Sequence, residues 1–171
     1  MNVFTLISTV FLTVILSWAA YHSYILFAGI RNKQKRIYEH VENYPKFSII
    51  IPAKDEGAVI SRCLNSLLNV DYPKDKLEII VVNGNSKDNT QQICEMFSAR
   101  YQGIVKVIHE KESKGKPAAL NRAFPYVTGE IIGIFDADSI PERAVLRKVA
   151  SYFQNKLIMA LQGSTNCINE K

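Results

Sequence analysis

Two aspartates separated by a single residue, Asp136 and Asp138, follow the apolar residues 131–135 in the stretch GEIIGIFDADS. An apolar run of this length is typical of a strand buried on both faces of a parallel sheet. Carboxylates directly after such a strand lie at the edge where open α/β sheets bind their ligands. Both are hard oxygen donors, suited to a divalent cation (Mg²⁺ or Mn²⁺) that in turn holds a diphosphate. The pattern predicts a metal and phosphate site.

A purely structural role would explain the same residues. Asp138 or Ser139 would then cap a helix that opens at Pro141 and Glu142. A pair of aspartates taken alone often matches a metal motif by chance. The choice between the two interpretations therefore depends on the rest of the chain.

Predicted strands and helices alternate along the chain after residue 46. Apolar runs predict strands at residues 47–52, 77–82, 105–109, 131–135 and 157–161. Helices are predicted at residues 58–69, from 89 or 90 onward, at 118–126 and at 142–153. The first two helices have apolar faces made of Val59, Ile60, Cys63, Leu64, Leu67 and Leu68, and of Ile93, Cys94, Met96 and Phe97. This alternation predicts βαβ units and a right-handed, mostly parallel, Rossmann-like sheet.

Charged and polar residues gather in the loops expected at the carboxyl ends of these strands. Because parallel strands end at one edge, we expect the side chains to form one site. They are Lys54, Asp55, Glu56, Asn83, Lys116, Asp136 and Asp138. Lys116 taken alone could equally be a solvated lysine before a helix. Glu56 taken alone would be a favourable acid in the first turn of a helix.

Residues 2–30 carry no Lys, Arg, Asp or Glu, which predicts one transmembrane helix. Trp18, Tyr21 and Tyr24 lie toward its second half, as interfacial aromatics often do. A basic linker over residues 31–46 follows, and the positive-inside rule then predicts a single-pass protein of the cell membrane with residues 47–171 in the cytoplasm. A cleaved signal peptide fits less well, because no basic residues precede the long apolar run.

The 171-residue chain has a formal net charge of +5. Four of its positive charges lie between residues 31 and 36, so the remainder is close to neutral and a nucleic-acid partner is not expected. The basic cluster instead suits anionic lipid headgroups. Cys63, Cys94 and Cys167 are odd in number and widely spaced, which predicts buried thiols in a reducing compartment.

Four motifs together resemble a known family. FSIIIPAKDEG, LEIIVVNGNSKDNT, KGKPAALNRAF and GEIIGIFDADS resemble, in order and spacing, the nucleotide-binding half of processive-type glycosyltransferase family 2 enzymes with a GT-A fold. The resemblance covers residues 47–163. It implies transfer of a sugar, with inversion, from a nucleotide-sugar donor to a carbohydrate or lipid-linked acceptor. Such a reaction would belong to the synthesis of a cell-surface polysaccharide or glycolipid.

The resemblance also implies roles for individual residues. Those that contact the donor would be Ala53, Lys54, Glu56, Asn83, Lys116 and Asp136. Asp136 and Asp138 would hold the divalent metal. A metal held there, helped by Lys116, would stabilise the charge that develops on the leaving nucleoside diphosphate.

The sequence departs from the family pattern in three places. Lys54 stands where the family usually has an aromatic residue, and Asn83 and Gly84 stand where acidic residues are usual, so the identity of the nucleotide stays open. The family's acceptor half and general base would follow Gly163. Glu170 is not a convincing base, so no catalytic residue is assigned. We therefore expect a C-terminally truncated, donor-binding portion.

Three functions remain open at this stage. The first is a membrane-anchored glycosyltransferase. The second is a non-catalytic nucleotide-sugar-binding subunit that needs a partner chain to supply the acceptor half. The third, a nucleotidyltransferase, is weakened because the first loop, PAKDEG, lacks a glycine-rich phosphate cradle.

Overall fold

The computed structural model of the chain describes residues 2–31 and 43–164. The chain divides into two compact units, Met1–Ile37 and Tyr38–Lys171, which are considered separately. Most of the basic linker falls outside the described residues, as do Cys167 and Glu170.

The described part of the first unit contains the helix α1, Val3–Arg31. Its residues Val3–Ala28 are long and apolar enough to cross a membrane, with a mean hydropathy of 2.1, although a signal sequence would meet the same criterion. The hydroxyl groups of the helix donate hydrogen bonds to its own backbone carbonyls. Thr9 Oγ1, for example, lies 2.9 Å from the carbonyl oxygen of Thr5, and Ser17 Oγ lies 2.8 Å from that of Thr13. These polar groups are thus satisfied without water, as a lipid environment requires.

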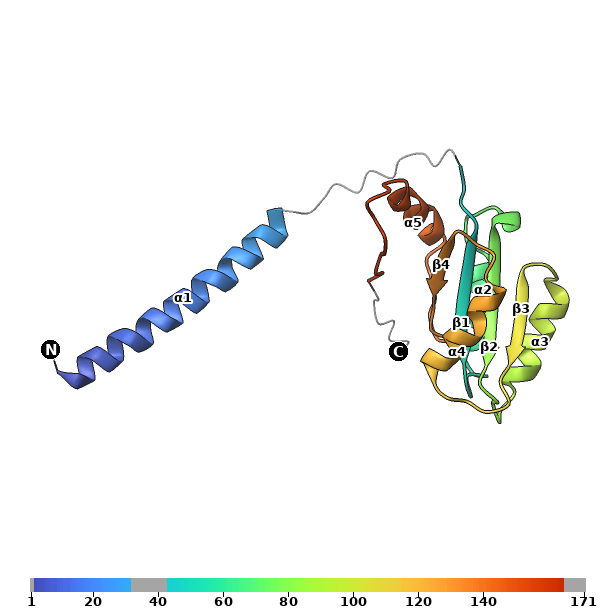
Figure 1. Cartoon of the computed structure of the whole chain (residues 1–171), viewed down its shortest axis with the longest axis horizontal. Helices are drawn as coiled ribbons and strands as arrows, with labels where there is room; N and C mark the ends of the chain where they lie inside the picture. Colours follow the sequence, from blue (N-terminus) through green and yellow to red (C-terminus); the bar gives the residue numbers. More distant parts are fainter. Residues whose placement is uncertain (1, 32–42, 165–171) are drawn as a thin grey trace. The chain divides into compact units, whose positions relative to one another are not determined.

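The second unit contains a four-stranded parallel sheet (Figure 1). Its strands are β1 (Phe47–Ala53), β2 (Leu77–Asn83), β3 (Val105–His109) and β4 (Ile131–Ile134), in the spatial order β3-β2-β1-β4. Each pair of neighbours runs parallel. The α/β architecture predicted from the sequence is confirmed.

Helices cover both faces of the sheet (Figure 1). On one face, α2 (Ile60–Leu68), α3 (Thr90–Arg100) and α5 (Val145–Phe153) pack on the larger apolar cluster. On the other face, α4 (Lys116–Ala123) packs through Ala119 and Ala123 on a smaller one. Short 3-10 helices occupy Lys74–Lys76 and Phe124–Tyr126. β1 and β2 are buried between these layers, which explains their continuous apolar sequences.

Two predictions about strands were wrong. β4 is an edge strand with one open face, since Ile132 and Ile134 are 42% and 48% exposed. α4 covers β1 and β2 but leaves this part of the face uncovered. The strand predicted at residues 157–161 does not form, and Leu157 and Met159 are largely exposed. A strand needs a neighbour for its backbone hydrogen bonds, and none of the described strands pairs with this segment.

Three smaller differences concern helices. α5 begins at Val145, not at Glu142, and no side chain caps it, so neither Asp138 nor Ser139 has the capping role considered above. Met96 of α3 is 60% exposed, although Cys94 and Phe97 are buried as predicted. The helix predicted at residues 118–126 begins earlier, at Lys116 with Pro117 in its first turn, and closes as a 3-10 turn.

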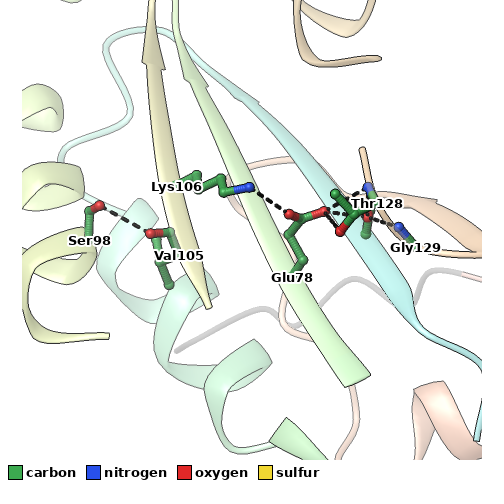
Figure 2. A network of polar contacts seen from close by, with 7 residues as sticks. Glu78, Ser98, Val105, Lys106, Thr128 and Gly129 are labelled. Carbon is green, nitrogen blue, oxygen red and sulfur yellow. Dashed lines mark hydrogen bonds and ion pairs between the residues drawn. The ribbon is translucent and has the colours of Figure 1, made fainter. Parts of the chain in front are cut away.

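A buried carboxylate joins all four strands near their amino ends (Figure 2). Glu78 of β2 accepts hydrogen bonds from Ser48 Oγ of β1 at 2.6 Å and from Lys106 Nζ of β3 at 3.0 Å. It also accepts the backbone N–H and the hydroxyl of Thr128, both at 3.2 Å. Thr128 and Gly129 lead directly into β4, so this network fixes where β4 enters the sheet.

Candidate functional site

The site predicted from the sequence lies at the carboxyl edge of the sheet, opposite the Glu78 network. Ala53 ends β1 and is buried, and its carbonyl oxygen accepts the backbone N–H of Gly84 at 2.8 Å. This bond holds the first residue after β2 against the end of β1. Lys54, the next residue, is exposed, and Glu56 is half-buried.

Lys116 and Asp136 come together at this edge. Lys116 is the first residue of α4, and its Nζ forms an ion pair with Asp136 Oδ1. Both side chains remain substantially exposed, at 49% and 63%. The two residues are 20 positions apart in the sequence and meet because α4 packs on β1 and β2 while β4 lies beside β1.

The turn that carries the two aspartates is held in place by the burial of its central residue and by contacts of its backbone. Ala137, between them, is buried in the larger apolar cluster. The carbonyl oxygen of Asp136 accepts the N–H of Ser139 at 3.0 Å and lies 3.6 Å from Cys63 Sγ of α2. Because Ala137 points inward, the side chains on either side of it are exposed to solvent. Burial, followed by the charges of Asp138 and Asp136, raises the pKa of the Cys63 thiol to about 12.

Negative charge accumulates around Glu56. Burial raises the pKa of Glu56 above its ordinary value, and the charges of Asp138, Asp88, Asp136 and Asp55 raise it further. Glu56 lies in the loop after β1, and the two aspartates of the motif lie in the loop after the neighbouring strand β4. Carboxylates held together in this way favour the binding of a cation among them.

Asn83, the last residue of β2, lies at the same edge but its side chain is turned inward. Its exposed fraction is 1%, and its Oδ1 accepts hydrogen bonds from Ser86 Oγ at 2.6 Å and from the backbone N–H of Ser86 at 3.3 Å. Its Nδ2 lies 3.3 Å from His109 Nδ1 of β3. The amide group thus fixes the loop after β2, and a ligand would have to replace one of these bonds to reach it.

Sequence reasoning placed Asp55 at this edge, but it missed Asp88 and the hydrogen bonds by which both residues connect the loops after β1 and β2. Asp55 accepts the N–H of Lys87 at 2.6 Å, and Asp88 accepts the N–H of Gly57 at 2.8 Å. Apolar periodicity carries no information about such bonds. One signal was available for Asp88: it lies two residues before the start of α3, where an acidic side chain commonly accepts the first free N–H groups.

The donor set suits a cation that arrives with a phosphate ligand. Among residues 2–31 and 43–164, no three His, Cys, Asp or Glu side chains are grouped closely enough to hold a metal by themselves. Asp136 and Asp138 would supply two carboxylate ligands at most. Mg²⁺ and similar ions commonly bind through one or two carboxylates together with the phosphates of a substrate and water. The residues present therefore fit a metal that binds together with a diphosphate.

Comparison with known sequences finds relatives that are substantially longer than this chain. A probable glycosyltransferase YdaM of Bacillus subtilis (strain 168) is 36% identical over 170 residues, covering 93% of this chain and 40% of that protein. A beta-monoglucosyldiacylglycerol synthase of Synechocystis sp. is 36% identical over 129 residues, covering 74% of this chain and 27% of that protein. This chain thus spans less than half the length of these relatives.

Solved structures share this fold, and their descriptions name nucleotide-sugar ligands. The mannosyltransferase PcManGT of Pyrobaculum calidifontis, in complex with GDP-Man and Mn²⁺, matches with a TM-score of 0.69 and 28% identity, over 83% of this chain and 43% of that one. S. aureus TarS in complex with UDP-GlcNAc matches with a TM-score of 0.59 and 32% identity, over 64% and 31% of the two chains.

The family model for glycosyl transferase family 2 matches residues 48–170, which include all of the sheet except Phe47, and both aspartates of the motif. Most of the chain is therefore covered by one family description, in agreement with the parallel sheet and with the relatives above. The chain belongs to glycosyl transferase family 2.

Proposed function

We propose that this chain is the donor-binding part of a membrane-anchored, inverting glycosyltransferase that uses a nucleotide-diphospho-sugar and a divalent metal. The acceptor would be a carbohydrate or a lipid-linked acceptor. A lipid-linked product would agree with the name of the Synechocystis relative, a beta-monoglucosyldiacylglycerol synthase. Retention at the membrane by α1 would place the site near such an acceptor.

The ion pair between Lys116 and Asp136 is the observation that carries this proposal. It puts a cation and a carboxylate side by side at the edge of a parallel sheet where phosphates bind. When a diphosphate enters, Lys116 has a new anionic partner, and Asp136 becomes free to ligate a metal. The pair thus keeps both side chains in place without burying either charge.

Asp136 and Asp138 would hold the metal. When bound, the metal would act as a Lewis acid that stabilises negative charge on the leaving diphosphate. Lys116 would contribute a second positive charge to the same oxygens. Ala53 and Lys54 would line the nucleoside pocket with Glu56, while Asn83 would keep the loop after β2 in the shape that faces the base.

The test is metal-dependent nucleotide binding by the full chain and by Asp138→Asn. UDP and GDP are titrated separately by calorimetry, with and without Mn²⁺. We expect the wild-type chain to bind one of them only with Mn²⁺, and the variant to bind it at least about tenfold more weakly, because a neutral amide is a poor ligand for a hard cation. The unfolding temperature should not change, since Asp138 is exposed.

Glu142→Gln is the matched control. Glu142 is also exposed, follows the same turn and carries the same charge, so its replacement removes an equal charge without touching the proposed ligands. Equal affinity in the wild type and Asp138→Asn would remove Asp138 from the metal site. If neither nucleotide binds under any condition, the proposed function is wrong. A measurement of sugar transfer by this chain alone would distinguish the two functions: transfer would indicate a glycosyltransferase, and nucleotide binding without transfer would indicate a binding subunit.

A further inference from the structure

The loop after β1 (residues 54–57, the β1 loop) has an unusual backbone at its centre. Asp55 has a φ of 56°, a left-handed conformation that costs free energy in a residue other than glycine. Two bonds to the loop after β2 hold it there. The N–H of Asp55 donates to Ser86 Oγ at 3.0 Å, and its carboxylate accepts the N–H of Lys87 at 2.6 Å.

The next two residues of the β1 loop are held by Asp88 and Thr90. The N–H of Glu56 donates to Thr90 Oγ1 at 2.8 Å, and the N–H of Gly57 donates to Asp88 Oδ2 at 2.8 Å. Thr90 is fully buried, and its hydroxyl donates to Asp88 Oδ1. Asp88 and Thr90 together, called here the Asp88–Thr90 clasp, therefore accept two successive N–H groups of the β1 loop.

The two loops approach each other closely at Gly57. A Cβ atom on Gly57 would lie 1.8 Å from Asn89 Oδ1 and 2.8 Å from Asp88 Oδ2. A side chain at this position would displace the side chains of Asn89 and Asp88, and Asp88 Oδ2 is the acceptor of the Gly57 N–H.

The clasp works against electrostatic repulsion. The pKa of Glu56 is raised by burial and then by the charges of Asp138, Asp88, Asp136 and Asp55. The two N–H bonds of the clasp act on the backbone of Glu56 and Gly57, so they hold the side chain in place without neutralising it.

We propose that Asp88 and Thr90 are positioning residues that hold the β1 loop, and with it Glu56, beside the two aspartates before any ligand arrives. This inference rests on the proposed function, because the site that it preforms is the proposed donor site. Preorganisation of this kind raises affinity by removing the cost of ordering the loop during binding. Neither residue is a metal ligand in this account.

Thr90→Val tests the proposal without a change of charge. Valine has nearly the shape of threonine but cannot accept the N–H of Glu56. We expect nucleotide affinity in the presence of Mn²⁺ to fall about tenfold, as expected when a preorganising hydrogen bond is lost. Thr90→Ser, which keeps the hydroxyl, should restore affinity to within about twofold of the wild type.

Amide hydrogen exchange supplies a readout that does not depend on binding. In the full chain without ligand, the N–H groups of Glu56 and Gly57 should exchange slowly, and Thr90→Val should accelerate both. Ser98→Ala is the control. It removes another hydroxyl of α3, near the opposite end of the helix from Thr90, which donates to the carbonyl of Val105 at 3.1 Å, and should leave exchange in the β1 loop unchanged.

Three results would overturn the proposal. Unchanged exchange of Glu56 in Thr90→Val would show that the clasp does not hold the loop. Unchanged nucleotide affinity in that variant would show that the loop need not be held. If Asp88→Asn lowered nucleotide affinity and Thr90→Val did not, Asp88 would act by contacting the metal or the nucleotide directly. Failure of the wild type to bind nucleotide would instead count against the proposed function, and exchange would still decide whether the clasp exists.

Discussion

Gly129 stands where the chain enters β4 and leaves no room for a side chain. A Cβ atom there would lie 2.6 Å from the backbone N of Ser48 and 2.8 Å from the carbonyl oxygen of Lys46. Its own N–H donates to Ser48 Oγ at 2.8 Å. The neighbours are backbone atoms of β1, which cannot move aside without breaking the sheet. A single residue therefore sets how closely β4 approaches β1.

Gly129→Ala should consequently lower the free energy of unfolding by about 2 kcal/mol or more. Urea unfolding followed by circular dichroism measures this change. Gly163→Ala is the matched control, because no atom lies within 4 Å of the Cβ that it would add. Similar small effects of the two substitutions would mean that the close contact between Gly129 and β1 is not maintained in solution.

Individual site residues were predictable when their position in the sequence revealed their place in the sheet. Asp136, Lys116 and Glu56 all follow predicted strands or open predicted helices, and the structure places them at one edge. Thr90 was not predictable, because its role is to accept one N–H from a loop more than thirty residues away. No periodicity or short motif encodes that contact.

Among the elements, β4 depends on the buried carboxylate of Glu78 for its position. Burial alone would raise the pKa of Glu78, but hydrogen bonds from Ser48, Lys106 and Thr128 outweigh it and hold the pKa below its ordinary value. A depressed pKa means that the ionised form stabilises the fold. This contribution is complete above the pKa of the unfolded chain, near 4.5, and is lost as pH falls through the lower pKa of the folded chain.

Glu78→Gln should therefore destabilise the protein at pH 7 by about 2 kcal/mol, the scale of hydrogen bonds to a charged group. The difference in unfolding free energy from the wild type should narrow as pH falls below about 4.5, because the carboxyl of the unfolded wild-type chain then takes up a proton before that of the folded chain. Urea unfolding at several pH values checks both points, with Glu112→Gln as an exposed control. If the difference in unfolding free energy between Glu78→Gln and the wild type were constant from pH 7 to pH 3, the charge of Glu78 would have no role in stability.

The order of elements was predictable from the sequence, but the surroundings of the last ones were not. The continuous apolar runs of β1 and β2 correctly predicted strands buried on both faces. The run at β4 looks the same, yet β4 lies at the edge of the described sheet and exposes Ile132 and Ile134. An apolar run shows that a segment can be buried. The order of the strands in the sheet determines which neighbours cover it.

On the scale of the whole molecule, an apolar helix precedes a domain of glycosyl transferase family 2. The proposed membrane span consists of Val3–Ala28 and carries no charged residue. Leu12→Lys combined with Leu16→Lys would place two charges near its centre, each costing about 3 kcal/mol in a bilayer. The double variant should be extracted from membranes by alkaline carbonate, whereas the wild type should stay in the pellet.

Leu12→Val combined with Leu16→Val provides the control, because it changes the same positions and keeps the helix apolar. This pair should remain in the membrane pellet. If carbonate extracts the wild type as fully as the lysine variant, α1 does not anchor the protein, and the membrane part of the proposal fails while the donor site is unaffected.

The central claim is that the carboxyl edge of the sheet binds a metal and a nucleoside diphosphate together. The most direct measurement is paramagnetic broadening of assigned amide resonances by Mn²⁺ in the full chain, with UDP and with GDP. The account predicts that resonances of residues 54–56 and 136–138 broaden strongly only when Mn²⁺ and one of the nucleotides are both present. Asp75 and Glu130, near the amino ends of β2 and β4, should stay sharp. Broadening centred on Asp75 and Glu130, or no broadening at residues 136–138, would contradict this claim.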